Sequence, residues 1–171
     1  NSNSYTIIYA SVMVVIVAFV LAFTSSSLKP IQDKNVESDK MKQILSALNV
    51  DTKGQDAQAI YEQYIKKDMI LDVNGAIKEE KGGFALGESK DQFALYVAEV
   101  DGQTKYIIPL YGSGLWGAIW GYVALNDDKN TVYGTYFSHA GETPGLGAEI
   151  TTAAFQAPFI GKQIMKEGEL V

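Results

Sequence analysis

Residues 138–150 read SHAGETPGLGAEI and separate a strand-like run from a helix-like one. Four positions of this loop are Gly or Pro, so its backbone conformation is specified by the sequence rather than left loose. Pro144 fixes its own φ, while Gly145 and Gly147 allow positive φ and let another group come close to the main chain. Leu146 then presents an apolar side chain at the tip of a rigid turn, which suits the flat face of an aromatic ligand. The alternative is a tight surface turn whose Leu folds back into the core.

Two motifs of this chain resemble those of a known domain family. Residues 142–147, ETPGLG, look like the signature of the FMN-binding domains in the C subunit of the sodium-pumping NADH:quinone reductase and in the G subunit of the Rnf electron-transport complex. Residues 109–117, PLYGSGLWG, are a second match that is more like the quinone reductase protein. The two motifs, the hydrophobic N-terminus and the order in which they occur extend the resemblance over nearly the whole chain. The resemblance implies an FMN-binding domain.

The N-terminus carries a membrane signal. Residues 5–23 are almost wholly apolar, and no charge precedes Lys29. A helix that spans the bilayer needs about 20 such residues, and lipid offers the backbone no other partners. A secretory signal peptide is the alternative, but the apolar run is long and no convincing cleavage site follows it. We expect an uncleaved, single-pass anchor with its linker over residues 1–28, and an FMN-binding domain, apparently lacking its C-terminal part, over residues 29–171.

Charge does not give the orientation of this anchor, because only one flank of the apolar run is visible. The resemblance implies an inner (cell) membrane protein whose soluble domain lies on the periplasmic, outer side.

Hydrophobic periodicity predicts an α+β fold beyond the anchor. After a short polar linker at 24–30, helical spacing covers 31–50 and 57–65. Strand-like alternation covers 69–77, 93–100, 103–110, 115–125 and 131–137. Asp101-Gly102 is a hairpin turn signal, and the strand at 115–125 would carry Trp116. Helices followed by strands predict helices packed on an antiparallel sheet.

Composition excludes several classes of function. The formal net charge is -6, and the sequence contains no Arg, which argues against nucleic acid as a partner. It contains no Cys, so this chain alone holds no disulfide, iron–sulfur cluster or Cys-ligated zinc. His139 is the only His, and we expect it to make a local hydrogen bond rather than to bind a metal. No nucleophilic triad or acid/base pair stands out, so we name no catalytic residue.

A flavin needs apolar walls for its ring, polar groups for its pyrimidine edge and an anchor for its phosphate. Leu146 and Trp116 are the candidates for the walls, although a Trp in core packing is the alternative. Gly114 would let the backbone approach the ligand, or would form a strand bend. Thr143 and backbone amides of the loop would bond the ring edge. Glu142 would accept a hydrogen bond from the ring or brace the loop.

The phosphate would meet the backbone amides near Thr151 and Thr152, with Lys162 as a cation. An exposed Lys is usually only solvated, so this last assignment has a simple alternative. The expected cofactor-binding residues are Gly114, Leu115, Trp116, Glu142, Thr143, Pro144, Gly145, Leu146, Gly147, Thr151, Thr152 and Lys162.

One departure from the resemblance concerns covalent attachment. The family attaches FMN through its phosphate to a Thr in a Ser-Gly-Ala-Thr motif, which this sequence lacks. We expect the attachment Thr downstream of Val171, and we expect this chain alone to hold no covalent FMN.

The resemblance implies an FMN-carrying electron-transfer subunit of a sodium-translocating NADH:quinone (ubiquinone) oxidoreductase. It would relay electrons between other redox centres, and the isolated chain would not be catalytic. Its partners would be the lipid bilayer and the other membrane, flavin and iron–sulfur subunits. The alternatives are the G subunit of an Rnf-type complex and a non-catalytic anchored assembly module.

Overall fold

The computed structural model describes residues 3–87 and 89–170, and the chain divides into two compact units, residues 1–39 and 40–171. The first unit consists of most of helix α1 (Asn3–Ala47). The side chains of residues 5–23 are exposed, and α1 contains a stretch with a mean hydropathy of 2.7. By length and composition, α1 is the one helix in the described part of the chain that fits a membrane span.

The predicted linker at residues 24–30 is wrong, because α1 continues through it. That prediction treated Ser, Thr and Pro as helix breakers. Thr24, however, donates its hydroxyl to the carbonyl of Val20 at 2.8 Å, which satisfies this polar group inside the helix. Pro30 also lies within α1, where it forgoes one backbone hydrogen bond. The helix predicted at 31–50 is therefore a continuation of α1.

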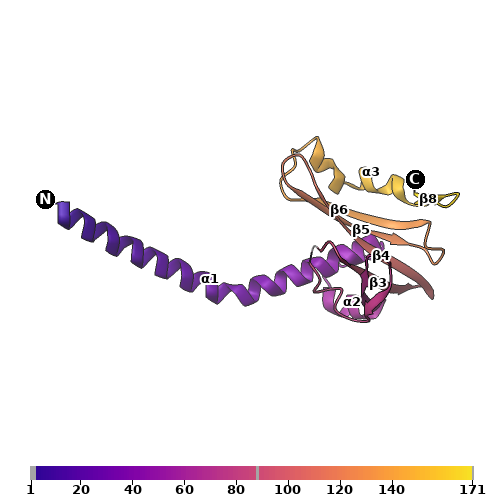
Figure 1. Ribbon diagram of the computed structural model, residues 1–171, viewed down its shortest axis with the longest axis horizontal. Helices are drawn as coiled ribbons and strands as arrows, with labels where there is room; N and C mark the ends of the chain where they lie inside the picture. The colour runs from indigo at the N-terminus through magenta and orange to yellow at the C-terminus, as the bar shows by residue number, and fades with distance from the viewer. Residues whose placement is uncertain (1–2, 88, 171) are drawn as a thin grey trace. The chain divides into compact units, whose positions relative to one another are not determined.

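Six antiparallel strands form the sheet of the second unit, in the order β2-β1-β3-β4-β5-β6. Figure 1 labels the neighbouring strands β3, β4, β5 and β6. Their bounds are β1 Ile65–Asp72, β2 Ile77–Glu79, β3 Gln92–Val100, β4 Gln103–Ser113, β5 Ala118–Leu125 and β6 Val132–His139. Helix α2 (Ala57–Tyr64) precedes the sheet, as predicted. The elements that follow it are η1 Gly147–Thr151, α3 Ala153–Gln156, η2 Ala157–Phe159, β7 Met165–Lys166 and β8 Glu169–Leu170. The α+β class is confirmed.

The hairpin of β3 and β4 forms where the sequence places it. Asp101 and Gly102 have φ values of 52° and 74°, which is the left-handed geometry of a two-residue turn whose twist matches its strands. The strand predicted at 69–77 is wrong at both ends, because β1 runs from Ile65 to Asp72. The side chain of Asp72 accepts hydrogen bonds from the amides of Asn74 and Ala76 at 2.8 and 2.9 Å, which makes residues 73–76 a turn.

The strand predicted at 115–125 starts too early, because β5 begins at Ala118. The amide of Gly114 donates to the carbonyl of Gly117 at 2.7 Å and closes a turn between β4 and β5. Leu115 and Trp116 occupy the two central positions of this turn. The structure therefore moves Trp116 from a strand face, where the sequence predicted it, to a turn.

The core of the second unit lies between the last turns of α1 and one face of the sheet. Ile44 and Ala47 of α1 are fully buried and belong to one cluster with Tyr96 and Tyr122. A side chain at Gly134 on β6 would meet the backbone carbonyl of Ala47, so this glycine lets the helix end approach the sheet closely. This packing fixes the strands whose far ends carry the candidate site.

Candidate functional site

The two sequence motifs meet at one end of strands β4, β5 and β6. One motif forms the turn at residues 114–117, and the other forms the loop at residues 140–147 that follows β6. The backbone amide of Trp116 donates to Oε1 of Glu142 at 2.9 Å, which joins the turn to the loop. The amide of Ala140 donates to the carbonyl of Ala118 at 2.8 Å and extends the β5–β6 pairing into the loop.

The carboxylate of Glu142 occupies the space above two glycines. A Cβ at Gly114 would meet Oε1 of Glu142, and a Cβ at Gly147 would lie 2.5 Å from Oε2. Neither glycine is among those with positive φ. Positive φ occurs at Gly145, where φ is 74°, but not at Gly147, where the missing side chain lets Glu142 come close to the main chain, which is the other role that the sequence indicated.

The polar groups of the loop bond largely to each other. The carbonyl of Thr143 accepts from the amides of Leu146 and Ala148, both at 3.1 Å. The amide of Gly145, which follows Pro144, donates to the carboxylate of Glu149 at 3.1 Å. This amide is therefore already engaged, whereas the sequence predicted that it would bond the ring edge of a flavin.

His139 makes the local hydrogen bond that the sequence predicted. It is the last residue of β6, and its Nδ1 accepts from the amide of Glu142 at 3.1 Å. Within residues 3–87 and 89–170, no group of three or more His, Cys, Asp or Glu side chains is placed to hold a metal ion.

Three large apolar side chains project from the joined turn and loop into solvent. Leu115 is 83% exposed, Trp116 is 69% exposed and Leu146 is 73% exposed. Exposed apolar groups gathered on neighbouring loops indicate a surface that binds a ligand or a partner. An aromatic ring and two aliphatic chains offer the apolar walls that an isoalloxazine ring requires. In their apolar character and exposure, Leu115, Trp116 and Leu146 fit the ring of FMN.

The predicted phosphate residues lie in two places. Thr151 donates its hydroxyl to the carbonyl of Ala148 at 3.0 Å, and Thr152 caps α3 by accepting from the amide of Phe155 at 3.3 Å. Both follow the loop directly along η1. Lys162 lies elsewhere: its carbonyl accepts from the amide of Val132 at 2.8 Å, at the opposite end of β6 from the loop. At about 3.4 Å per residue, the length of β6 from Val132 to His139 separates the backbone contact of Lys162 from the loop by about 24 Å.

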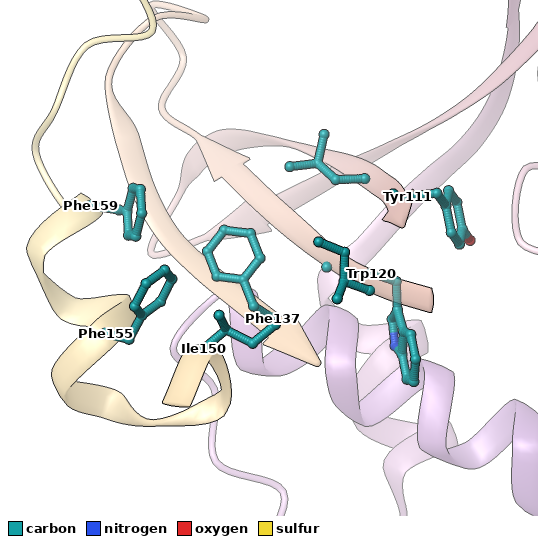
Figure 2. Close-up of a pocket in the computed structure, with 10 residues that line it drawn as sticks. Tyr111, Trp120, Phe137, Ile150, Phe155 and Phe159 are labelled. Atoms are coloured by element: carbon teal, nitrogen blue, oxygen red, sulfur yellow. The ribbon is translucent and has the colours of Figure 1, made fainter. Parts of the chain in front are cut away.

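Sequence reasoning missed an apolar pocket on the sheet face beside the turn. The pocket has a volume of about 270 Å³ and is lined by Leu110, Tyr111, Gly112, Ile119, Trp120, Gly121, Phe137, Ile150, Phe155 and Phe159. Figure 2 shows Phe155 and Phe159, from the helical segment, close to Phe137 of β6, and the ring centroids of Phe137 and Phe159 are 5.6 Å apart. The four-residue spacing of Phe155 and Phe159 was the sequence feature that could have indicated this pocket.

Comparisons with known proteins agree with this geometry. The FMN-binding domain family matches residues 114–169, a range that holds both the turn and the loop. The C subunit of the Na(+)-translocating NADH-quinone reductase from Haemophilus ducreyi is 29% identical, over 96% of this chain and 73% of that protein. The corresponding protein from Pasteurella multocida is 33% identical, over 86% of this chain and 67% of that protein.

A solved structure shows the same fold. The crystal structure of the C subunit of the Na(+)-translocating NADH-quinone reductase from Parabacteroides distasonis superposes with a TM-score of 0.80 and 43% identity. The match covers 84% of this chain and 74% of that one.

Proposed function

Because this chain belongs to the family of the C subunit of the Na(+)-translocating NADH-quinone reductase, we propose that it is a membrane-anchored, FMN-carrying subunit that relays electrons within such a reductase. The names of its relatives favour this function over that of the G subunit of an Rnf-type complex. When bound, FMN would supply the centre that takes up electrons and passes them on.

The hydrogen bond between Trp116 and Glu142 carries this proposal, because it places the two motifs side by side. Trp116, Leu115 and Leu146 would cover the apolar ring, and Thr143, Pro144 and the glycines would shape the loop around its edge. The exposure of these side chains would leave part of the ring accessible. Access of this kind suits electron transfer, which needs the close approach of a partner's redox centre.

We also propose where the phosphate of FMN would lie. Thr151 and Thr152 follow the loop and would lie nearest to it, while Lys162, whose carbonyl accepts from Val132 at the other end of β6, would lie away from it. The resemblance implies covalent attachment to a Thr in a Ser-Gly-Ala-Thr motif, which residues 1–171 do not contain. This chain alone should therefore hold FMN reversibly, and a fluorescent flavin band that survives denaturing electrophoresis would contradict that expectation.

The membrane assignment rests on α1. Its exposed apolar residues would cross the inner membrane once, with the sheet unit on the periplasmic side. Other membrane, flavin and iron–sulfur subunits of the reductase would be its partners. Proteolysis of intact spheroplasts tests the orientation: cleavage of the sheet unit from outside is expected, and its protection until the cells are lysed would reverse the assignment.

Titration of the purified full chain with FMN tests the proposed function itself. The chain in detergent micelles should quench flavin fluorescence to saturation at one FMN per chain. If the chain binds no FMN, the alternative of a non-catalytic anchored assembly module would be favoured. Subunits that co-purify from native membranes would separate the quinone reductase from an Rnf-type complex.

A further inference from the structure

We propose that Glu142 is a positioning residue that fixes the turn at 114–117 against the loop at 140–147, and that its carboxylate does not contact the flavin. This inference rests on the proposed function, because it concerns how the FMN walls are held. The sequence alone allowed two roles for Glu142, a hydrogen bond to the ring and a brace for the loop. The geometry favours the brace.

Both carboxylate oxygens of Glu142 face the protein backbone. Oε1 accepts the amide proton of Trp116 at 2.9 Å and lies over Gly114. Oε2 lies over Gly147 of the loop. The half-buried carboxylate thus lies between the backbone positions of Gly114 and Gly147, and its oxygen Oε1 already accepts a hydrogen bond from the protein.

The backbone of Glu142 is fixed as well. Its amide donates to Nδ1 of His139 at 3.1 Å, and His139 is paired with Ile119 at the end of β5 and β6. The side chain therefore extends from a point that the sheet holds in place. The sheet holds the backbone of Glu142, and the carboxylate of Glu142 is hydrogen-bonded to Trp116. Together these contacts give the turn one position relative to the loop.

The two glycines have a shared explanation in this arrangement. Each is next to an apolar residue of the site: Gly114 precedes Leu115, and Gly147 follows Leu146. Because neither needs positive φ, their missing side chains serve to admit the Glu142 carboxylate. The position of one carboxylate thus sets the separation between the apolar side chains of the two motifs.

Four variants test this role in the full chain without FMN. Glu142→Gln keeps an acceptor oxygen at the same reach, whereas Glu142→Ala removes it and Glu142→Asp shortens it by one methylene. Gly114→Ala leaves Glu142 in the sequence but puts a methyl group where its carboxylate lies. The readout is hydrogen exchange at the Trp116 amide, measured by NMR in micelles, with the buried Tyr96 amide as a control for folding.

The Trp116 amide should exchange about tenfold faster in Glu142→Ala, Glu142→Asp and Gly114→Ala, as expected for the loss of a hydrogen bond to a charged group. In Glu142→Gln, exchange should stay close to that of the parent chain. Adding Gly114→Ala to Glu142→Ala should change little further, because the carboxylate it displaces is already gone and only the Ile119 side chain, 3.0 Å from the added Cβ, remains close. Equal exchange in Glu142→Ala and the parent chain would overturn the proposal.

The FMN titration separates this inference from the proposed function. Affinity for FMN should fall about tenfold in the same three variants and persist in Glu142→Gln. If the parent chain binds no FMN, the proposed function fails, while the exchange data still report on the brace. If the exchange data agree but Gly114→Ala binds FMN as tightly as the parent chain, the brace does not position the site and the inference fails.

Discussion

The amide of Trp116 donates to the carboxylate of Glu142 at 2.9 Å, across 26 residues of sequence. Through this contact, a turn between two strands and a loop after a third form one surface. Three exposed apolar side chains lie on that surface, and the site can therefore be tested separately from the fold beneath it.

Two tyrosines with buried hydroxyl groups, Tyr61 and Tyr96, should respond oppositely to loss of these hydroxyls. The hydroxyl of Tyr61 is buried and has no hydrogen-bond partner in the described structure, whereas that of Tyr96 donates to the carbonyl of Gly83 at 3.1 Å. Tyr61→Phe should raise the free energy of unfolding by about 1 kcal/mol, and Tyr96→Phe should lower it by about 1 kcal/mol. Urea unfolding in micelles, followed by Trp fluorescence, measures both. Shifts of the same sign would contradict the contrast.

The same tyrosines should make the fold sensitive to alkaline pH. Burial raises the pKa of Tyr61, Tyr96 and Tyr122 above the ordinary value of 10.0. Above about pH 10 the unfolded chain releases protons that the native chain keeps, so native stability is full below that pH and falls as pH rises. Urea midpoints from about pH 9 to about pH 11 should show this fall, and it should be shallower in Tyr96→Phe. An equal fall of the urea midpoint with pH in Tyr96→Phe and in the parent chain would rule out a contribution from Tyr96.

Gly134 should be intolerant of any side chain. A Cβ at this position would meet the backbone carbonyl of Ala47, which cannot move without shifting the end of α1. Gly134→Ala should cost about 1–3 kcal/mol of unfolding free energy. Gly87→Ala is the matched control, because its Cβ would meet nothing within 4 Å. Equal urea midpoints for the two variants would refute the close approach.

Lys162 should be dispensable for FMN binding. Its backbone contact with Val132 lies about 24 Å from the loop along β6, beyond the Debye length of about 8 Å at physiological salt. Lys162→Ala should therefore leave FMN affinity within about twofold of the parent chain. A tenfold loss in a fluorescence titration would return Lys162 to the site.

Much of the fold was predictable because local patterns decide it. Alternation and the Asp101-Gly102 turn indicated β3 and β4, and apolar length indicated the N-terminal helix. The linker prediction failed because composition alone does not show that Thr24 satisfies its own hydroxyl within a helix. The strand prediction failed at Trp116 because Leu and Trp are common in strands, and only the backbone closure of the turn reveals their place.

The site was only partly predictable, since its geometry depends on contacts between distant segments. The motifs led to Trp116 and Leu146, and the sequence offered two reasons for Gly147, positive φ and the close approach of another group. The actual reason is the volume of the Glu142 carboxylate. Lys162 was expected to act as a cation for the phosphate, but the chain between Thr152 and Lys162 runs to the other end of β6.

The central claim is that Trp116 and Leu146 hold the flavin ring, and an FMN titration of Trp116→Ala and Leu146→Ala tests it most directly. Each variant should weaken binding by about tenfold and shift the flavin absorbance bands, because each removes one apolar wall. Leu170→Ala is the matched control, since Leu170 is similarly exposed but lies on β8. Unchanged affinity and spectra in both wall variants would contradict the account.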